Sequence, residues 1–146
     1  MTLDAVISPD RVLPKLRATD KGTLLGELAR RAGLALGLPA GQIAEALAAR
    51  EALGSTGVGA GIAVPHARLE GVQTPVGFFV SLQRPIDWSA IDGRPVDLIF
   101  LLLSPATNGA HLTALAAVSR RLRDPSVAVG IRAARNAASV RALLLG

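Results

Sequence analysis

His66 and His111 are the only histidines in this sequence, and their settings suit nucleophilic chemistry. His66 follows Pro65 at the end of a glycine-rich stretch that begins at Gly54. Glycine allows close backbone approach and positive φ, whereas proline fixes its own φ and biases the preceding residue toward an extended conformation. These residues predict a short strand that ends abruptly and presents His66 at a rigid, defined point.

A neutral imidazole at that point could act as a nucleophile and carry a phosphoryl group. His111 falls in the first turn of a helix expected to start near Asn108, where free N–H groups favour an anion and disfavour imidazolium. Even an unperturbed histidine, with a pKa of about 6.5, is mostly neutral at pH 7. We therefore expect both rings to be neutral and to lie where strands end, the usual place for ligands in open α/β sheets.

Groups near His66 could bind the phosphoryl charge. Arg50 lies at the end of the helix expected before the glycine-rich stretch, and its guanidinium fork matches phosphate oxygens. Two unit charges about 4 Å apart interact by roughly 4 kcal/mol at an effective dielectric of 20, so one well-placed arginine outweighs a diffuse net charge. The hydroxyls of Ser55 and Thr56 and the backbone amide of Gly57 are expected to add further donors.

Other interpretations of these residues stay open. A lone histidine is more often structural than catalytic, and the glycine-rich stretch could be a tight strand–turn–strand. No Gly-Lys-Ser/Thr follows the glycines, as a P-loop requires, and their spacing differs from a dinucleotide-binding fingerprint. Two histidines without cysteine argue against a zinc site, and no Gly-x-Ser-x-Gly elbow supports Ser-His-Asp hydrolysis. We expect no metal and no organic cofactor.

Length and composition favour one domain away from the membrane. The chain has 146 residues, enough for a single domain with its own core. The longest apolar run, Leu98–Leu103, is far shorter than the ~20 residues of a membrane-spanning helix, and the first residues do not resemble a signal peptide. The absence of cysteine excludes thiolate chemistry and fits a cytoplasmic protein.

The net charge of +5 and the pI of about 11.2 raise the possibility of a nucleic-acid partner. The basic residues are scattered, however, and aromatic residues make up 3% of the chain, with no tyrosine. No stacking platform for single strands is therefore visible. We expect a solvated basic surface, and nucleic-acid binding stays the weaker alternative.

Apolar periodicity and capping signals predict interleaved helices and strands. Helix 21–36 is expected to be capped by Thr19 or Asp20, and the last helix is expected to start at Asn136 or Ser139. The first residues are expected to form a short strand or an extended arm. The sequence predicts a loop over 84–95 and an inward face of Leu112, Leu115, Val118 and Leu122 on helix 108–122. The expected strands are 11–13, 75–82 and 96–103, and the expected helices are 21–36, 40–52, 108–122, 125–134 and 136–145.

Strand 96–103 is apolar on both faces, as expected of a central strand that helices cover on each side. Together these elements predict an α/β fold, a mixed β-sheet flanked by helices on both faces in a single compact domain spanning residues 1–146.

The run Arg50–His66 resembles the signature of enzyme IIA proteins of the bacterial phosphotransferase system, fructose/mannitol class. Within that class it is most similar to the nitrogen-regulatory branch. The stretches Pro85–Gly93, Pro95–Leu103 and His111–Ala116 agree with this resemblance, which spans nearly the whole chain.

The resemblance implies that His66 accepts a phosphoryl group from an HPr-type histidine phosphocarrier. It implies that His111 hydrogen-bonds the phosphoryl group or orients the first ring, and that Arg50 stabilises the charge. It also implies a soluble α/β domain without a metal or organic cofactor. Family members are commonly neutral or acidic, so the basic charge here bears on the choice of partner more than on the chemistry.

Three functions follow from this resemblance. The leading one is a regulatory phosphocarrier that acts on target proteins. The alternatives are a sugar-specific IIA component that passes phosphate to a IIB domain of a fructose/mannitol transporter, and a non-catalytic IIA-like interaction module.

Overall fold

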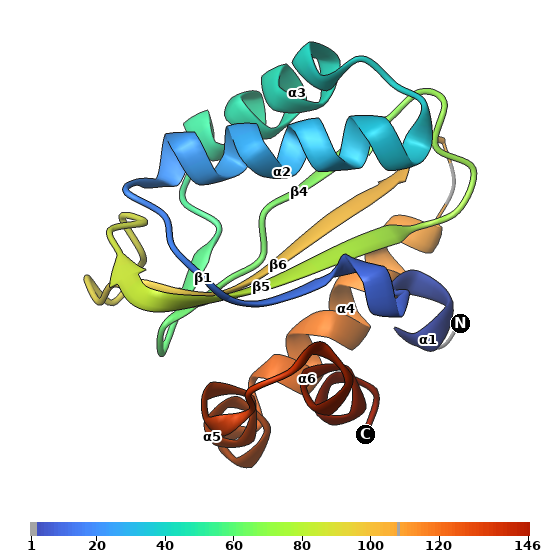
Figure 1. Cartoon of the computed structure of the whole chain (residues 1–146). Coiled ribbons are helices and arrows are strands. Elements are labelled where there is room, and N and C mark those ends of the chain that lie inside the picture. The colour runs from blue at the N-terminus through green and yellow to red at the C-terminus, as the bar shows by residue number, and fades with distance from the viewer. Residues whose placement is uncertain (1–2, 108) are drawn as a thin grey trace.

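A mixed β-sheet runs through the middle of the protein, between two layers of helices (Figure 1). The computed structural model describes residues 3–107 and 109–146. The main path of the sheet has the order β1-β5-β6-β3-β2, and β4 also pairs with β6. β5 and β6 are antiparallel, whereas β1 is parallel to β5. The strands are β1 (Val12–Leu16), β2 (Gly57–Gly59), β3 (Ile62–Ala63), β4 (His66–Leu69), β5 (Val76–Ile86) and β6 (Val96–Pro105).

Helices α2 and α3 cover one face of the sheet, and α1, α4, α5 and α6 cover the other (Figure 1). Strand β6 is buried on both faces: its even-numbered residues 98–102 belong to the core beside α4, and its odd-numbered residues 99–103 to the core beside α2 and α3. The predicted α/β fold is therefore confirmed. The helices are α1 (Leu3–Val6), the 3-10 turn η1 (Pro9–Arg11), α2 (Lys21–Leu36), α3 (Ala40–Ala52), α4 (Ala110–Leu122), α5 (Pro125–Ala133) and α6 (Ala137–Leu145).

Side-chain caps start three of these helices. Asp20, Asp124 and Asn136 each accept a hydrogen bond from a backbone N–H in the first turn, 2.7–2.9 Å away. Such caps satisfy N–H groups that have no partner inside the helix. The predicted starts of α2, α5 and α6 are confirmed, with Asp20 rather than Thr19 as the cap of α2 and Asn136 rather than Ser139 as the cap of α6.

Three element predictions need correction. Residues 3–6 are helical rather than extended, because Val6 and Ile7 pack into the core beside α4. β5 continues to Ile86, inside the predicted loop 84–95, because Ile86 pairs with Val96 of β6. Contrary to the sequence prediction, the strand before His66 does not end there. After β3, only Val64 and Pro65 lie outside the strand, and β4 continues alongside β6 from His66 onward.

The predicted inward face of helix α4 is confirmed at its C-terminal half and wrong at its start. Val118 and Leu122 are buried and Leu115 packs against the core, whereas Leu112 is 63% exposed and His111 and Ala114 are buried instead. Because His111 and Leu112 are adjacent, helical spacing allows either of them on the inward face, and apolar character alone favoured Leu112. The predicted start at Asn108 lies outside the described residues. The rotation of the helix matters because it turns His111 toward the sheet.

Candidate functional site

His66 begins strand β4 at the edge of the sheet, and two contacts fix its ring. Its Nδ1 lies 2.8 Å from the carbonyl oxygen of Val64, and its Nε2 lies 3.2 Å from Nε of Arg50. A carbonyl can only accept, so Nδ1 carries the proton. Arg50 can only donate, so Nε2 is the unprotonated nitrogen. The nucleophilic lone pair of the neutral ring is therefore at Nε2, facing a guanidinium.

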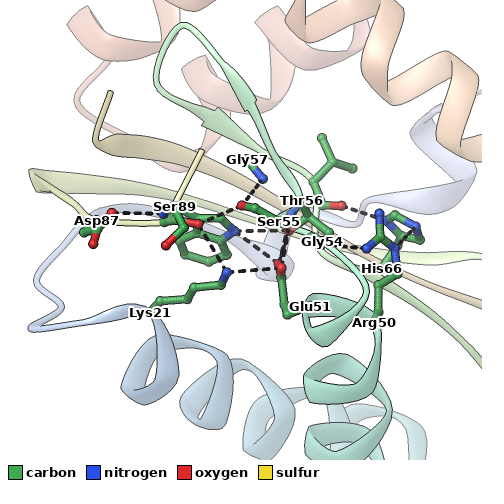
Figure 2. Close-up of polar contacts among 12 residues, drawn as sticks. Lys21, Arg50, Glu51, Gly54, Ser55, Thr56, Gly57, His66, Asp87 and Ser89 are labelled. Carbon is green, nitrogen blue, oxygen red and sulfur yellow. Dashed lines mark hydrogen bonds and ion pairs between the residues drawn. The ribbon is translucent and has the colours of Figure 1, made fainter. Parts of the chain in front are cut away.

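Arg50 reaches His66 from the last turn of α3. Besides its bond to His66, it donates from Nη1 to the carbonyl oxygen of Gly54, 2.8 Å away (Figure 2). This second bond ties the guanidinium to the start of the glycine-rich stretch. Arg50 is thereby held with one N–H at the atom where a new covalent bond could form.

His111 comes from the first turn of α4 and lies beside His66. The two ring centroids are 5.4 Å apart and the ring planes are inclined by 43°. The side chain is buried, with 5% of its surface exposed, and its Nδ1 has no hydrogen-bond partner within the described part of the chain. Buried polar groups are nearly always paired. A nitrogen without a partner beside His66 is a position where a bound group could complete the hydrogen bonding.

A surface pocket of about 310 Å³ opens at these three side chains. The end of α3 forms one wall, β4 forms another, and the start of α4 contributes His111. The lining residues are Ala46, Ala49, Arg50, Leu53, His66, Ala67, Arg68 and His111. The site predicted from His66, His111 and Arg50 is thus brought together in one place, as the sequence reasoning required.

Both histidine rings have a lowered pKa, and burial is the main cause. For His66, the positive charges of Arg50 and Arg68 lower the pKa further, against the opposing effects of the Val64 carbonyl and Glu51. For His111, His66 and Arg68 lower the pKa after burial. Both rings are therefore neutral at pH 7, the form that the chemistry needs. Desolvation, rather than the helix N-terminus invoked from the sequence, is the leading cause.

The side chain of Glu51 points away from this pocket and anchors the following loop. Its carboxylate accepts from the backbone N–H of Thr56 at 3.1 Å and from Nε1 of Trp88 at 3.2 Å, and it pairs with Nζ of Lys21 at 3.2 Å. The Thr56 hydroxyl also bonds to this carboxylate. Figure 2 shows Glu51 with Lys21 on one side and Arg50 with His66 on the other.

The predicted phosphoryl-binding residues after Arg50 lie in this second cluster. The Ser55 hydroxyl donates to the Trp88 carbonyl at 2.7 Å and accepts from the Gly57 N–H at 3.0 Å. A Cβ at Gly57 would lie 2.7 Å from Cβ of Ala90, so close packing requires glycine there. Thr56 is buried, at 3% exposure. In this structure the three residues shape the loop, and their binding of a phosphoryl group stays a prediction.

The sequence reasoning assigned no role to Arg68, which also lines the pocket. A signal was available: in a strand, residues two apart share a face, and Arg68 is two residues after His66. The reasoning missed it because the strand was expected to end before His66. Trp88 was likewise unassigned, and its contact with Glu51 joins segments too distant in sequence for a local pattern to predict.

No group of three or more His, Asp or Glu side chains within residues 3–107 and 109–146 is arranged to hold a metal ion. Among the helices of that same described part, none has both the length and the apolar character that a bilayer crossing requires.

Comparison with known proteins defines the class. Residues 5–146 match the family described as phosphoenolpyruvate-dependent sugar phosphotransferase system, EIIA 2. Because the match spans nearly the whole chain, the protein belongs to this family, whose members carry phosphoryl groups. The resemblance drawn from the Arg50–His66 motif is confirmed.

Individual relatives narrow the class to its nitrogen-regulatory branch. The nitrogen regulatory protein of Bradyrhizobium diazoefficiens is 42% identical over 145 residues, which cover 99% of this chain and 95% of that protein. The nitrogen regulatory protein of Escherichia coli strain K12 is 38% identical, over 93% of this chain and 85% of that protein. By contrast, the fructose-specific EIIA component of Haloferax volcanii is 42% identical over 57% of this chain and 54% of its own length.

Solved structures agree with this assignment. The crystal structure of nitrogen regulatory protein IIA-Ntr from Neisseria meningitidis is 32% identical and has a TM-score of 0.93, over 97% of this chain and 98% of that one. IIA mannitol from Escherichia coli has a TM-score of 0.75 at 20% identity, over 94% of this chain and 97% of that one. The second likeness supports the fold alone.

Proposed function

We propose that this chain is a phosphohistidine carrier of the nitrogen-regulatory type. It accepts a phosphoryl group on Nε2 of His66 from an HPr-type histidine phosphocarrier and, in the phosphorylated state, changes its binding to target proteins. One observation carries the proposal: the unprotonated Nε2 faces the guanidinium of Arg50 at an open pocket. A neutral imidazole beside a fixed cation is what a phosphoryl acceptor needs.

The transfer consists of one bond exchange at phosphorus. Nε2 of His66 attacks the phosphorus as the P–N bond to the donor imidazole breaks. The donor ring, protonated on its other nitrogen, takes the electron pair of that bond and leaves as a neutral imidazole, and the positive charge passes to the phosphorylated ring of His66. The proton on Nδ1 stays in its hydrogen bond to the Val64 carbonyl, so no base has to remove it. Arg50 and His111 then act on the phosphoryl oxygens rather than on a proton.

Each supporting group has a distinct task. Arg50 cannot keep its bond to Nε2 once that nitrogen is phosphorylated, and we expect its N–H groups to turn to the phosphoryl oxygens. A guanidinium is suited to this because it stays charged and donates in a fork. The neutral ring of His111, whose Nδ1 has no partner in the described chain, is expected to take the tautomer that donates to a further phosphoryl oxygen.

The extent of similarity favours the regulatory type over a transporter component. The nitrogen regulatory relatives align along nearly the whole of both chains, whereas the fructose-specific component aligns over about half of each. A phosphoryl group adds about two negative charges to the pocket surface, enough to change a protein contact by electrostatics alone. A IIB domain as recipient is the alternative, and a regulatory target protein is the partner we favour.

Incubation with an HPr-type carrier charged with ³²P tests the proposal. We expect the wild-type protein to gain label that is stable in base and labile in acid, as a histidine phosphoramidate is. His66→Ala should gain none. Circular dichroism should show that the variant keeps the wild-type fold, since His66 is only half-buried.

Two outcomes would overturn the proposal. Label that persists in His66→Ala would place the acceptor elsewhere. A wild-type protein that gains no label would leave the non-catalytic interaction module as the better interpretation.

A further inference from the structure

Arg68 shares a face of strand β4 with His66. The burial of the strand alternates: Ala67 and Leu69 are in the core, His66 is half-buried and Arg68 is exposed. Because successive side chains of a strand point to opposite faces, His66 and Arg68 project to the same side. Both residues line the pocket, together with His111.

Arg68 differs from the other arginine of the pocket in its contacts. Arg50 already donates to His66 and to the Gly54 carbonyl. Arg68 makes no hydrogen bond or ion pair with any other residue in the ranges 3–107 and 109–146 for which the structure gives contacts. Its charge nevertheless acts on both histidine rings, whose pKa values it helps to lower. A cation without a partner at the mouth of the pocket is available to a bound anion.

The phosphoryl group offers more acceptors than the groups named so far can fill. It carries close to two negative charges at neutral pH and has three strong acceptor oxygens. The ring of His66 keeps its Nδ1 proton and so offsets one of these charges, but that proton is bonded to the Val64 carbonyl and not to a phosphoryl oxygen. Arg50 and His111 can donate to two of the oxygens, which leaves one for a further cationic donor.

We propose that Arg68 is the second phosphoryl-binding arginine of this site and contacts the oxygens of the group on His66 from the solvent side. This inference rests on the proposed function and names a residue that the site needs in addition to Arg50. Arg68 donates hydrogen bonds to the phosphoryl oxygens as the P–N bond forms at Nε2. Arg68 takes no proton and forms no covalent bond, so the bonds formed and broken in the transfer are the same as described above.

The test measures two labelling rates in Arg68→Ala, one with the phosphorylated HPr-type carrier and one with phosphoramidate. Phosphoramidate donates a phosphoryl group and releases ammonia, and it has no protein surface to dock. We expect both rates to fall roughly five- to tenfold, a modest effect because an exposed cation is screened by solvent. Arg68→Lys should recover part of the rate, because it keeps the charge but loses the fork.

Arg84→Ala is the matched control, since Arg84 is also an exposed arginine on a strand. His66 pairs with Leu102, and Leu102 with Gly77 of β5. Arg84 is therefore roughly 20 Å along the sheet from His66, at about 3.3 Å per residue. This variant should label at the wild-type rate with both donors. A histidine titration by NMR should show a higher pKa for His66 in Arg68→Ala and no change in Arg84→Ala.

The possible results distinguish a failure of the role of Arg68 from a failure of the proposed carrier function. If wild type labels and Arg68→Ala labels at the same rate with both donors, Arg68 does not bind the phosphoryl group, and the carrier function stands. A loss confined to the protein donor would make Arg68 a docking residue and would also overturn the inference. If wild type takes no label from either donor, the proposed function fails and the role of Arg68 fails with it.

Discussion

Arg50 and Glu51 are neighbours in the sequence, yet their side chains belong to regions with opposite properties. Around Glu51, every acceptor and donor described above is paired: Lys21, Thr56 and Trp88 all bond to one carboxylate. Around Arg50 the pairing is incomplete, because one buried nitrogen of the pocket and one exposed arginine have no partner in the described chain.

This difference in pairing suggests different roles for the two regions: the Glu51 cluster stabilises the fold, and the pocket at Arg50 is suited to binding. Most buried polar groups in folded proteins are satisfied, so a cluster such as that of Glu51 holds its segment in one conformation. Where groups beside a neutral histidine stay unsatisfied, a bound ligand could complete the hydrogen bonding, as in the function proposed above. The glycine-rich stretch therefore joins a rigid anchor at one end to a receptive pocket at the other.

Loss of Arg50 should have the largest effect, and on transfer alone. In Arg50→Ala we expect the rate of phosphoryl acceptance to fall by roughly 10²- to 10³-fold, since a preorganised donor to developing charge is removed. The melting temperature should change little. Calorimetry beside the labelling assay measures both. A drop in stability as large as that of a core truncation would show that Arg50 belongs with the structural region.

Loss of Glu51 should produce the opposite result. Glu51→Ala removes the acceptor of the buried Thr56 N–H and the ion pair of Lys21, while Trp88 Nε1 keeps its bond to the Thr56 hydroxyl and Lys21 its bond to the Trp88 carbonyl. We expect this to cost about 3 kcal/mol of unfolding free energy. For a domain of this size that corresponds to a fall of roughly 10 °C in melting temperature. Urea denaturation measures the change. Glu45→Ala, an exposed glutamate on the same helix, serves as control and should be near neutral. If Glu51→Ala and Glu45→Ala were equally stable, the Glu51 cluster would not be the structural anchor inferred here.

His111 should show an intermediate effect. His111→Ala removes one hydrogen bond to the charged phosphoryl group, so we expect His66 to stay modifiable at a rate about tenfold lower. Thr113→Ala, an exposed change on the same helix, is the control for α4. The labelling assay with phosphoramidate compares the two variants. Transfer at the wild-type rate in His111→Ala would leave this residue without the role assigned to it.

The smallest effect is on the pH dependence of stability. Burial lowers the pKa of both histidines in the folded state, so the unfolded chain binds protons first as the pH falls. The free energy of unfolding should therefore decrease as the pH falls below the ordinary histidine pKa of about 6.5. Denaturation curves from pH 8 to pH 5 measure this. A double His66→Gln, His111→Gln variant should flatten the slope, and a rise in stability on acidification would contradict the lowered pKa values.

Much of the fold was predictable because its signals are local. Asp20, Asp124 and Asn136 cap helices as short polar side chains do, and the unbroken apolar run of β6 indicated a strand covered on both faces. The boundaries that failed depend on distant partners. Residues 3–6 are helical because of the core beside α4, and β5 extends to Ile86 because Val96 pairs with it.

The site divides in the same way. Residue types and spacing predicted the family, the candidate acceptor His66 and the arginine near it. Only the tertiary structure decided which side chains meet the ring of His66. Adjacent residues of a helix project about 100° apart, so Arg50 faces His66 while Glu51 faces Trp88. The packing of α4 on the sheet turned His111 inward in place of Leu112. A one-dimensional pattern contains the period of a helix, but its rotation is fixed by what the helix packs against.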